Sequence, residues 1–497
     1  MSVLLRCTLR PAGWYRSLAL LACLAVLAGT TAQAQPAADS GKPAAPPLRF
    51  LDPQPNPDRP HHTKTEAELE ADAGPNQRQL LVMLRLPATH YRPDATYGGR
   101  YMDDNGNGAR RRRAELLARQ HGLTLVEGWA MSLLGVDCYV MQYPDKDDPR
   151  RLIEKLSRDP QVEWAQQVAD FEGMAQTAMP AVSAPTPASM AQPGMSDSDA
   201  LYPVQPAARY WHVADLHRHA TGRAVRVAVV DSGIDGEHPD LAGQLAVNTN
   251  FVDGGPPPAE IHGTAVAGII AARSGNGGIV GVAPSAKIMG LRACWQTTSQ
   301  TTRCNSFTLS KAINYAILNG AKVINLSLSG PPDRLLDRLL DVALERGISV
   351  VGAVDAQAGG PAFPANHRGV VAVASQPRIK AMAATAAAAL PAVTAAPAGA
   401  NANVSLLAPG DDIPTTAPGA RWSFVNGSSY AAAHVSGMLA LLEELRPNAS
   451  PAQLRSMLQP PEVLKTANID ACATISRLIR QCSCTCPANL SQRDAKR

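Results

Sequence analysis

The sequence is poor in aromatic residues and in charge. Aromatic residues make up 4% of the 497 residues and charged residues 18%, whereas 45% are hydrophobic and the chain holds 38 glycines and 41 prolines. This much apolar material excludes a chain that is disordered throughout. The length corresponds to about three domains of ordinary size.

The chain also lacks a strong charge imbalance once its first residues are set aside. Residues 1–34 contain Arg6, Arg10 and Arg16 and no acidic residue, so without them the net charge of +4 falls to +1. A near-neutral chain gives no argument for binding nucleic acid or an acidic lipid surface. We therefore expect no nucleic-acid partner.

No apolar run is long enough to span a bilayer comfortably. Residues 1–34 read instead as a signal peptide, because three arginines precede the apolar run 18–28 and Ala32-Gln33-Ala34 fits the small-x-small cleavage pattern. An uncleaved anchor and a lipoprotein acylated at Cys23 are the alternatives. We expect a bacterial protein that is secreted or periplasmic, with no membrane span after cleavage.

The cysteines are few, and their number is odd once the signal is removed. Nine cysteines minus Cys7 and Cys23 leave seven, which are expected to pair in an oxidising compartment with at least one left over. Cys294 and Cys304 enclose a polar loop and predict a local disulfide. The C-terminal cysteines have no nearby histidine and no C-x-x-C spacing, which favours disulfides over zinc. The pairing of five cysteines is left open: Cys138, Cys472, Cys482, Cys484 and Cys486.

Composition divides the chain into successive segments. We predict a signal peptide at 1–34, a flexible leader at 35–75, a small domain at 76–172, a linker at 173–200, a large domain at 201–458 with a low-complexity insertion at 376–403, and a Cys-containing tail at 459–497. Pro- and Ala-rich texture marks the leader and the linker, and exposes the linker to proteolysis.

The small domain shows a β-α-β-β-α-β order. Strands are expected at 79–86, at 123–143 as a pair around a turn near 134–135, and at 162–171, with helices at 110–121 and 149–158. This order predicts a ferredoxin-like α+β unit.

The large domain alternates strands with helices. Strands are expected at 225–230, 286–291, 323–328, 348–354 and 370–374, and helices from 262, at 309–320, at 334–346 and at 428–445, with one more short helix past Pro447. Such alternation predicts an α/β fold with a doubly wound parallel sheet and helices on both faces.

One segment imitates the first half of a calcium loop. Residues 103–108 read D-x-N-x-N-G, but the twelfth position is Ala114 and the arginines 110–113 crowd the segment with positive charge. Calcium loops carry a glutamate at that position. The sequence therefore predicts a turn here and no calcium site.

Three short motifs each place a reactive side chain at the edge of a regular element. Asp231 directly follows a buried strand, while His262 and Ser429 each start a helix rich in Gly and Ala. A serine hydroxyl becomes a nucleophile when a base removes its proton, and a buried carboxylate can orient the imidazole that acts as this base. In the order Asp231, His262, Ser429 they predict a catalytic triad.

These motifs, together with Gly281-Val-Ala-Pro-Ser-Ala-Lys287 and residues 323–330, resemble the subtilisin-like serine peptidases of the S8 family. The resemblance covers about 201–458, roughly half of the chain. It implies a serine endopeptidase that works through an acyl-enzyme, with Ser429 as nucleophile, His262 as base and then acid, and Asp231 as the residue that orients the imidazole.

The resemblance also implies how a peptide is bound and how activity is controlled. A peptide would pair as an added strand with four consecutive residues, Ser327, Leu328, Ser329 and Gly330. The domain at 76–172 resembles the family's inhibitory propeptide, so that the chain would be a zymogen that cuts its own linker. Expected partners are protein or peptide substrates and its own prodomain, and we expect a monomer without an organic cofactor. Structural calcium is common in such proteases, but no ligand set is identified here.

The chain departs from the family pattern at two places. The segment around the nucleophile reads Gly427-Ser-Ser-Tyr-Ala-Ala-Ala-His434, and Tyr430 in place of Met is expected to reshape the rim of the site. The residue that aligns with the family's oxyanion Asn is Asp355, or Ala356 with a shift of one. An Asp donates a hydrogen bond to an oxyanion only when it carries a proton.

Two alternative functions remain open. The missing oxyanion Asn supports the first alternative, a catalytically weak or silent relative that binds peptides. The long leader and tail permit the second, a self-cleaving export module. Broad degradation of casein would indicate the protease, self-cleavage alone the export module, and neither activity the silent relative.

Overall fold

The computed structural model describes residues 78–86, 101–173, 199–355, 362–376, 405–459, 468–481 and 484, with side chains from 108 onward in the second range. The predicted signal peptide and leader lie outside the described residues. So do most of the linker and of the insertion, the end of the tail, and three single residues that the sequence singled out: Ala356, Cys482 and Cys486.

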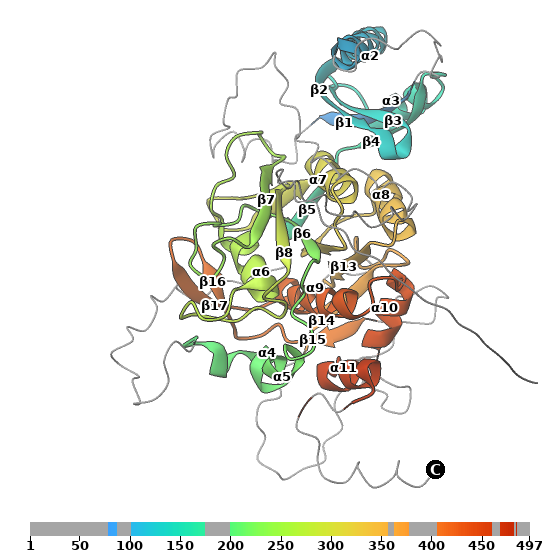
Figure 1. Cartoon of the computed structure of the whole chain (residues 1–497). Coiled ribbons are helices and arrows are strands. Elements are labelled where there is room, and N and C mark those ends of the chain that lie inside the picture. Colours follow the sequence, from blue (N-terminus) through green and yellow to red (C-terminus); the bar gives the residue numbers. More distant parts are fainter. Residues whose placement is uncertain are drawn as a thin grey trace, which may run out of the picture. The chain divides into compact units, whose positions relative to one another are not determined.

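The small domain is an antiparallel sheet with two helices. Its strands are β1 (Gln79–Arg85), β2 (Thr124–Met131), β3 (Val136–Gln142) and β4 (Val162–Gln167) in the order β2-β3-β1-β4, and its helices are α2 (Tyr101–Gln120) and α3 (Pro149–Ser157) (Figure 1). Side chains alternate along β1, as the period of two in a strand requires. Leu80 and Val82 pack with Leu117 and Leu156 of the helices, whereas Leu81 and Met83 lie on the opposite face.

Two predictions for this domain are wrong. Residues 103–108 belong to helix α2 and do not form a turn. Compared with Ala, Asp and Asn reduce the stability of a helix by less than about 1 kcal/mol per residue. Acidic residues near a helix start also interact favourably with the helix dipole. The expected last strand at 162–171 is two strands, because the chain leaves β4 after Gln167 and forms β5 (Asp170–Gly173) in another sheet.

The large domain is built on a seven-stranded sheet in which every pair of neighbours is parallel. The strands in spatial order are β15 (Leu406–Ala408), β14 (Val371–Ser375), β13 (Ser349–Ala353), β11 (Val323–Leu326), β6 (Arg226–Asp231), β8 (Lys287–Arg292) and β7 (Leu245–Asn250). This confirms the predicted α/β class with a parallel sheet.

Helices cover both faces of this sheet. The helices are α6 (Ile261–Ala271), α7 (Ser306–Leu318), α8 (Arg334–Glu345) and α9 (Ser428–Leu445). Along β6, Val227 and Val229 pack in the core with α6 and α9, whereas Ala228 and Val230 pack in the core with α7 and α8. A strand buried on both faces reads as a continuous apolar run, which is why the sequence located β6 well.

Most of the shorter elements escaped the sequence analysis. They are η3 (Tyr202–Val204), α4 (Pro206–Arg209), α5 (Val213–Leu216), β9 (Cys294–Gln296), β10 (Thr302–Asn305), β12 (Leu328–Ser329), β16 (Ile413–Ala417), β17 (Arg421–Val425), α10 (Pro451–Leu458) and α11 (Ala471–Ile479). Helix α10 was expected as one more short helix, but α11 was not. Ala471 and Ile475 of α11 are buried in the same core as α9, so this part of the tail belongs to the large domain.

The described residues contain two disulfides, Cys294–Cys304 and Cys472–Cys484, and Cys138 is a buried free thiol. Within the described residues, no three His, Cys, Asp or Glu side chains gather as they would around a metal ion. None of the described helices combines the length and the apolar character needed to cross a bilayer.

Glu443 near the end of α9 makes stability depend on pH. Its side chain is 3% exposed, and Oε1 has no hydrogen-bond partner among the described residues. Burial raises the pKa of this carboxyl from 4.5 to about 7, and the charge of Lys322 opposes the shift only in part. Because the folded-state pKa lies above the unfolded value, this contribution to stability is complete below pH 4.5 and is lost as the pH rises through 7.

We predict that Glu443→Gln raises the melting temperature relative to the wild type at about pH 9 and changes it little near pH 4.5, because Gln stays neutral. The expected gain at high pH is on the order of 1–2 kcal/mol. Thermal unfolding across this pH range measures it, with the exposed Glu345→Gln as control. A difference from wild type that does not vary with pH would contradict the prediction.

Candidate active site

Asp231 and His262 meet at the carboxyl edge of the parallel sheet. Asp231 is the last residue of β6, and His262 lies in the first turn of α6; their side chains are 2% and 4% exposed. His262 Nδ1 and Asp231 Oδ1 are 2.6 Å apart, a hydrogen bond that the imidazole donates. The carboxylate is held in turn by the backbone N–H of Ser232, which donates to Oδ1 at 2.7 Å.

Glycine follows His262 because the two motifs touch through their backbones. The N–H of Gly263 donates to Ser232 Oγ at 3.0 Å, and a Cβ on Gly263 would collide with the carbonyl of Ser232. A side chain at this position would push the start of α6 away from the end of β6. The absence of one keeps the imidazole within reach of Asp231.

Ser429 lies in the first turn of α9 and is fully buried. In this conformation its Oγ donates to the carbonyl oxygen of Ser327 at 3.0 Å, and Ser327 Oγ donates back to the carbonyl of Ser429 at 3.0 Å. His262 Nε2 has no hydrogen-bond partner among the described residues. The structure therefore joins Asp231 to His262 and Ser429 to Ser327, with no hydrogen bond between Ser429 and His262.

Tyr430 lies between the Asp231–His262 pair and the Ser429–Ser327 pair. Its ring lies against the imidazole of His262, with 5.6 Å between the ring centroids, and its side chain is 1% exposed. Burial raises the pKa of the phenol, with a smaller contribution from the charge of Asp231, so the ring stays neutral. The expectation that Tyr430 reshapes the rim is therefore wrong, because the residue belongs to the core behind His262.

A buried polar chain fixes the loop on which Ser327 lies. Ser436 on α9 donates to Asn325 Oδ1 at 2.8 Å, and Asn325 Nδ2 donates to Ser327 Oγ at 2.9 Å. Ser327 then donates to the carbonyl of Ser429. These bonds tie the end of β11 to the first turn of α9. They therefore fix the position of the Ser327 carbonyl to which the Ser429 hydroxyl donates.

The four residues predicted to bind a peptide form strand β12 and its flanks. Leu328 and Ser329 pair in antiparallel register with Gly173 and Glu172 of β5, which is part of this same chain. On its other side β5 pairs with β10, where Cys304 is opposite Phe171. An extended segment therefore lies between β12 and β10 in the position where the sequence analysis expected a peptide.

Phe171 is the buried anchor of this segment. Its ring is fully buried and meets Phe363 edge to face, with centroids 5.5 Å apart. Gly330 leaves room for it, since a Cβ there would overlap the ring of Phe171. Glu172 points the other way and forms an ion pair with Arg303 at 2.8 Å, in which both side chains are largely exposed.

The sheet of the small domain packs on α7 and α8. Its second face, with Met83, Cys138 and Trp164, forms one apolar cluster with Phe307 and Leu335. Polar contacts frame this cluster. Gln166 donates to Asp333 at 2.8 Å, Lys311 pairs with Glu127 at 3.1 Å, and Arg334 and Arg338 lie over the ring of Trp164.

Asp355 lies two residues beyond β13 and is half-buried. The backbone before it is anchored by the N–H of Val354, which donates to the carbonyl of Val373 at 2.8 Å. Its role as an oxyanion donor stays a prediction.

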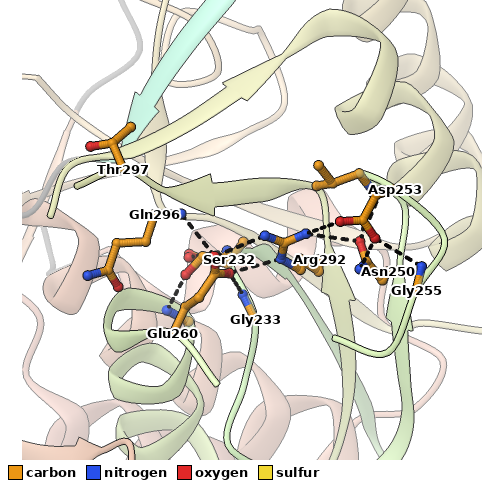
Figure 2. A network of polar contacts seen from close by, with 12 residues as sticks. Ser232, Gly233, Asn250, Asp253, Gly255, Glu260, Arg292, Gln296 and Thr297 are labelled. Carbon is orange, nitrogen blue, oxygen red and sulfur yellow. Dashed lines mark hydrogen bonds and ion pairs between the residues drawn. The ribbon is translucent and has the colours of Figure 1, made fainter. Parts of the chain in front are cut away.

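The sequence analysis missed one network beside Asp231 and His262. Glu260, Arg292 and Gln296 form charged and polar contacts around the Asp231 loop (Figure 2). One signal was available, since Glu260 stands two residues before His262. A single buried charge is invisible in a sequence until its partner is known, and Arg292 is 32 residues away.

Comparison with known proteins agrees with this geometry. Residues 222–465 match the model of the subtilase family. Subtilisin Savinase of Lederbergia lenta is 32% identical over 247 residues, which are 49% of this chain and 85% of that protein. M-protease of Shouchella clausii (strain KSM-K16) is 32% identical over 247 residues, 49% of this chain and 60% of that one.

Among solved structures, the chain resembles fervidolysin from Fervidobacterium pennivorans, described as a keratinolytic enzyme related to subtilisin. The TM-score is 0.57 at 21% identity, with 80% of this chain and 60% of that chain covered. This likeness concerns the fold. The chain thus spans about 60% of the length of M-protease and of fervidolysin.

Proposed function

Because the chain belongs to the subtilase family, a family of serine-type endopeptidases, we propose that it hydrolyses peptide bonds through an acyl-enzyme at Ser429. The observation that carries the proposal is the 2.6 Å hydrogen bond from His262 Nδ1 to Asp231, beside the ring of Tyr430, the residue that follows Ser429. A buried carboxylate that accepts from Nδ1 leaves the lone pair of the imidazole on Nε2, where a base needs it.

In the proposed reaction Ser429 Oγ exchanges its hydrogen bond to Ser327 for one to His262 Nε2. As Oγ attacks the substrate carbonyl carbon, its proton moves to Nε2, and Asp231 stabilises the imidazolium. The imidazolium then gives this proton to the leaving amine, and the C–N bond breaks to leave the acyl-enzyme. Water repeats the sequence with His262 as base, which releases the acid and restores Ser429.

The developing oxyanion requires donors. The N–H of Ser429 is one of the first four in α9, which have no partner within the helix. The carboxyl group of Asp355, two residues beyond β13, is the proposed second donor. Substrate would lie between β12 and β10 as an added strand, in the manner of β5.

We further propose that residues 76–172, with β5, act as an inhibitory prodomain and that the chain is a secreted or periplasmic monomeric zymogen. Two features support this. Segment β5 pairs with β12, the strand proposed to receive the substrate, and the sheet of the small domain packs on α7 and α8 through an apolar face. The signal-like residues 1–34 support export. The linker 173–200 would be cut by the enzyme itself.

The first prediction concerns Ser429→Ala. The variant should remain as the full-length precursor and lose at least about 10³-fold in casein hydrolysis, because the nucleophile is gone. Gel analysis in a host without other extracytoplasmic proteases, and casein assays on purified protein, measure both. Normal maturation of the variant would contradict self-processing, and a wild type that cuts neither casein nor itself would favour the silent relative.

The second prediction concerns the anchor of β5. Phe171→Ala in the full chain should weaken inhibition after self-cleavage by at least about 10²-fold, because truncating a buried Phe costs about 3–5 kcal/mol. Casein hydrolysis would then begin with a much shorter lag. Glu172→Ala is the matched control, since its exposed ion pair with Arg303 is worth at most about 1 kcal/mol. Equal lags for the two variants would contradict the role of β5.

The third prediction concerns Asp355→Asn. Asn donates a hydrogen bond at every pH, whereas an acid donates only when protonated. The variant should raise kcat by up to about tenfold, because a missing oxyanion donor is costly. Steady-state kinetics of wild type and variant on one peptide substrate measure this. An unchanged kcat would remove Asp355 from the mechanism.

A further inference from the structure

A buried guanidinium lies directly behind the catalytic pair. Arg292 ends β8, is 2% exposed, and pairs in the sheet with Asp231 at the end of β6. Figure 2 shows its guanidinium between Glu260 on one side and Asn250 and Asp253 on the other. Nη1 donates to Asn250 at 3.2 Å and lies 3.5 Å from Asp253, while Nε and Nη2 each donate to Glu260 at 3.0 Å.

The carboxylate of Glu260 accepts four hydrogen bonds, two on each oxygen. Oε2 accepts from Arg292 and from the N–H of Gly233 at 2.5 Å, and Oε1 accepts from Arg292 and from the N–H of Gln296 at 3.0 Å. The side-chain oxygen of Gln296 accepts from the N–H of Ile261 at 3.0 Å. A buried carboxylate is tolerated when it is paired and its lone pairs are used, and Arg292 meets the first condition.

These bonds join three segments that the reaction needs. Gly233 is two residues beyond Asp231, and Glu260 is two residues before His262. Gln296 is on β9, which is separated from β5 by the single strand β10. The backbone repeats one of the links, since the N–H of Glu260 donates to the carbonyl of Gly233 at 3.2 Å. A single carboxylate thus fixes the Asp231 loop, the start of the His262 helix and the edge of the peptide-binding sheet relative to one another.

We propose that Glu260, held in place by Arg292, is a positioning residue that sets the alignment of Asp231 and His262. The inference rests on the proposed hydrolysis at Ser429. Glu260 does not touch the reacting atoms. It acts through the backbone on either side of the catalytic pair, and it links that pair to the strand that receives the substrate.

The structure makes Glu260→Gln a sharp test. Each oxygen of Glu260 faces two N–H groups, so either orientation of a glutamine places its NH₂ against donors. The expected result is a fall in kcat of about 10- to 100-fold, the size associated with a shift of about 1 Å in a catalytic group. The rate at which a fluorophosphonate labels Ser429 should fall in parallel, because this probe needs the base but not the peptide-binding strands.

Glu444→Gln is the matched control. Glu444 also captures backbone N–H groups, those of Thr221, Gly222 and Arg223, but all three donate to one oxygen, which a glutamine retains. Its kcat should stay within about twofold of the wild type. Melting temperatures of both variants separate loss of positioning from loss of fold.

A double-mutant cycle gives the readout that a purely structural role would not move. In a His262→Ala background the residual turnover does not use the imidazole, so Glu260→Gln should change it by less than about twofold. The Ser429→Ala protein supplies the blank. A loss that is as large in the His262→Ala background as in the wild type would overturn the proposal, and so would a folded Glu260→Gln enzyme with wild-type kcat.

Arg292→Lys keeps the test decisive if Glu260→Gln does not fold. Lysine retains the charge but cannot form the two-pronged contact with Glu260. It should lower kcat about tenfold, again only when His262 is present. Wild-type kcat in a folded Arg292→Lys enzyme would overturn the proposal. An inactive, unlabelled wild type would overturn the proposed function as well, whereas an active wild type with an unaffected variant would overturn this inference alone.

Discussion

The hydrogen bond between Asp231 and His262 is the contact to which the rest of the large domain is fitted. It spans the junction of β6 and α6, and it forms only because Gly263 lets the helix start approach the carbonyl of Ser232. The parallel sheet places Asp231 at its carboxyl edge, where the buried carboxylate meets the first turn of α6. Tyr430 lies against the imidazole, whose Nδ1 is bonded to Asp231 and whose Nε2 has no hydrogen-bond partner among the described residues.

Burial extends from this bond to the Ser429 hydroxyl. This hydroxyl has no exposed surface and donates to Ser327, the residue before β12. A peptide that paired with β12, as we propose, would therefore lie next to the residue that holds the Ser429 hydroxyl. Segment β5 makes that pairing with Leu328 and Ser329, and its anchor Phe171 fills the space that Gly330 leaves.

The sequence predicted the parts that follow from local pattern. The continuous apolar run of β6 and the motifs at Asp231, His262 and Ser429 located the parallel sheet and the residues proposed for the triad. It did not predict short or tertiary features. The two-residue strand β12 has no periodicity to detect, α11 forms because Ala471 and Ile475 meet a core built elsewhere, and β5 separates from β4 only because β10 and β12 offer it edges. At residues 103–108 the turn-forming residue types predicted a turn, whereas the segment is part of helix α2.

The same reasoning explains why Glu260 was overlooked and why it matters. In a sequence, a charged residue just before a helix is typical of a solvent-exposed helix start. Only the fold shows that Arg292 donates to both carboxylate oxygens of Glu260. Burying a carboxylate is costly unless every lone pair is used, and here the donors come from three separate segments. If any one of these segments moved, a donor and an acceptor would be left unpaired in a buried site. The energetic cost of an orphaned charge therefore acts against the small displacements that would separate His262 from Asp231.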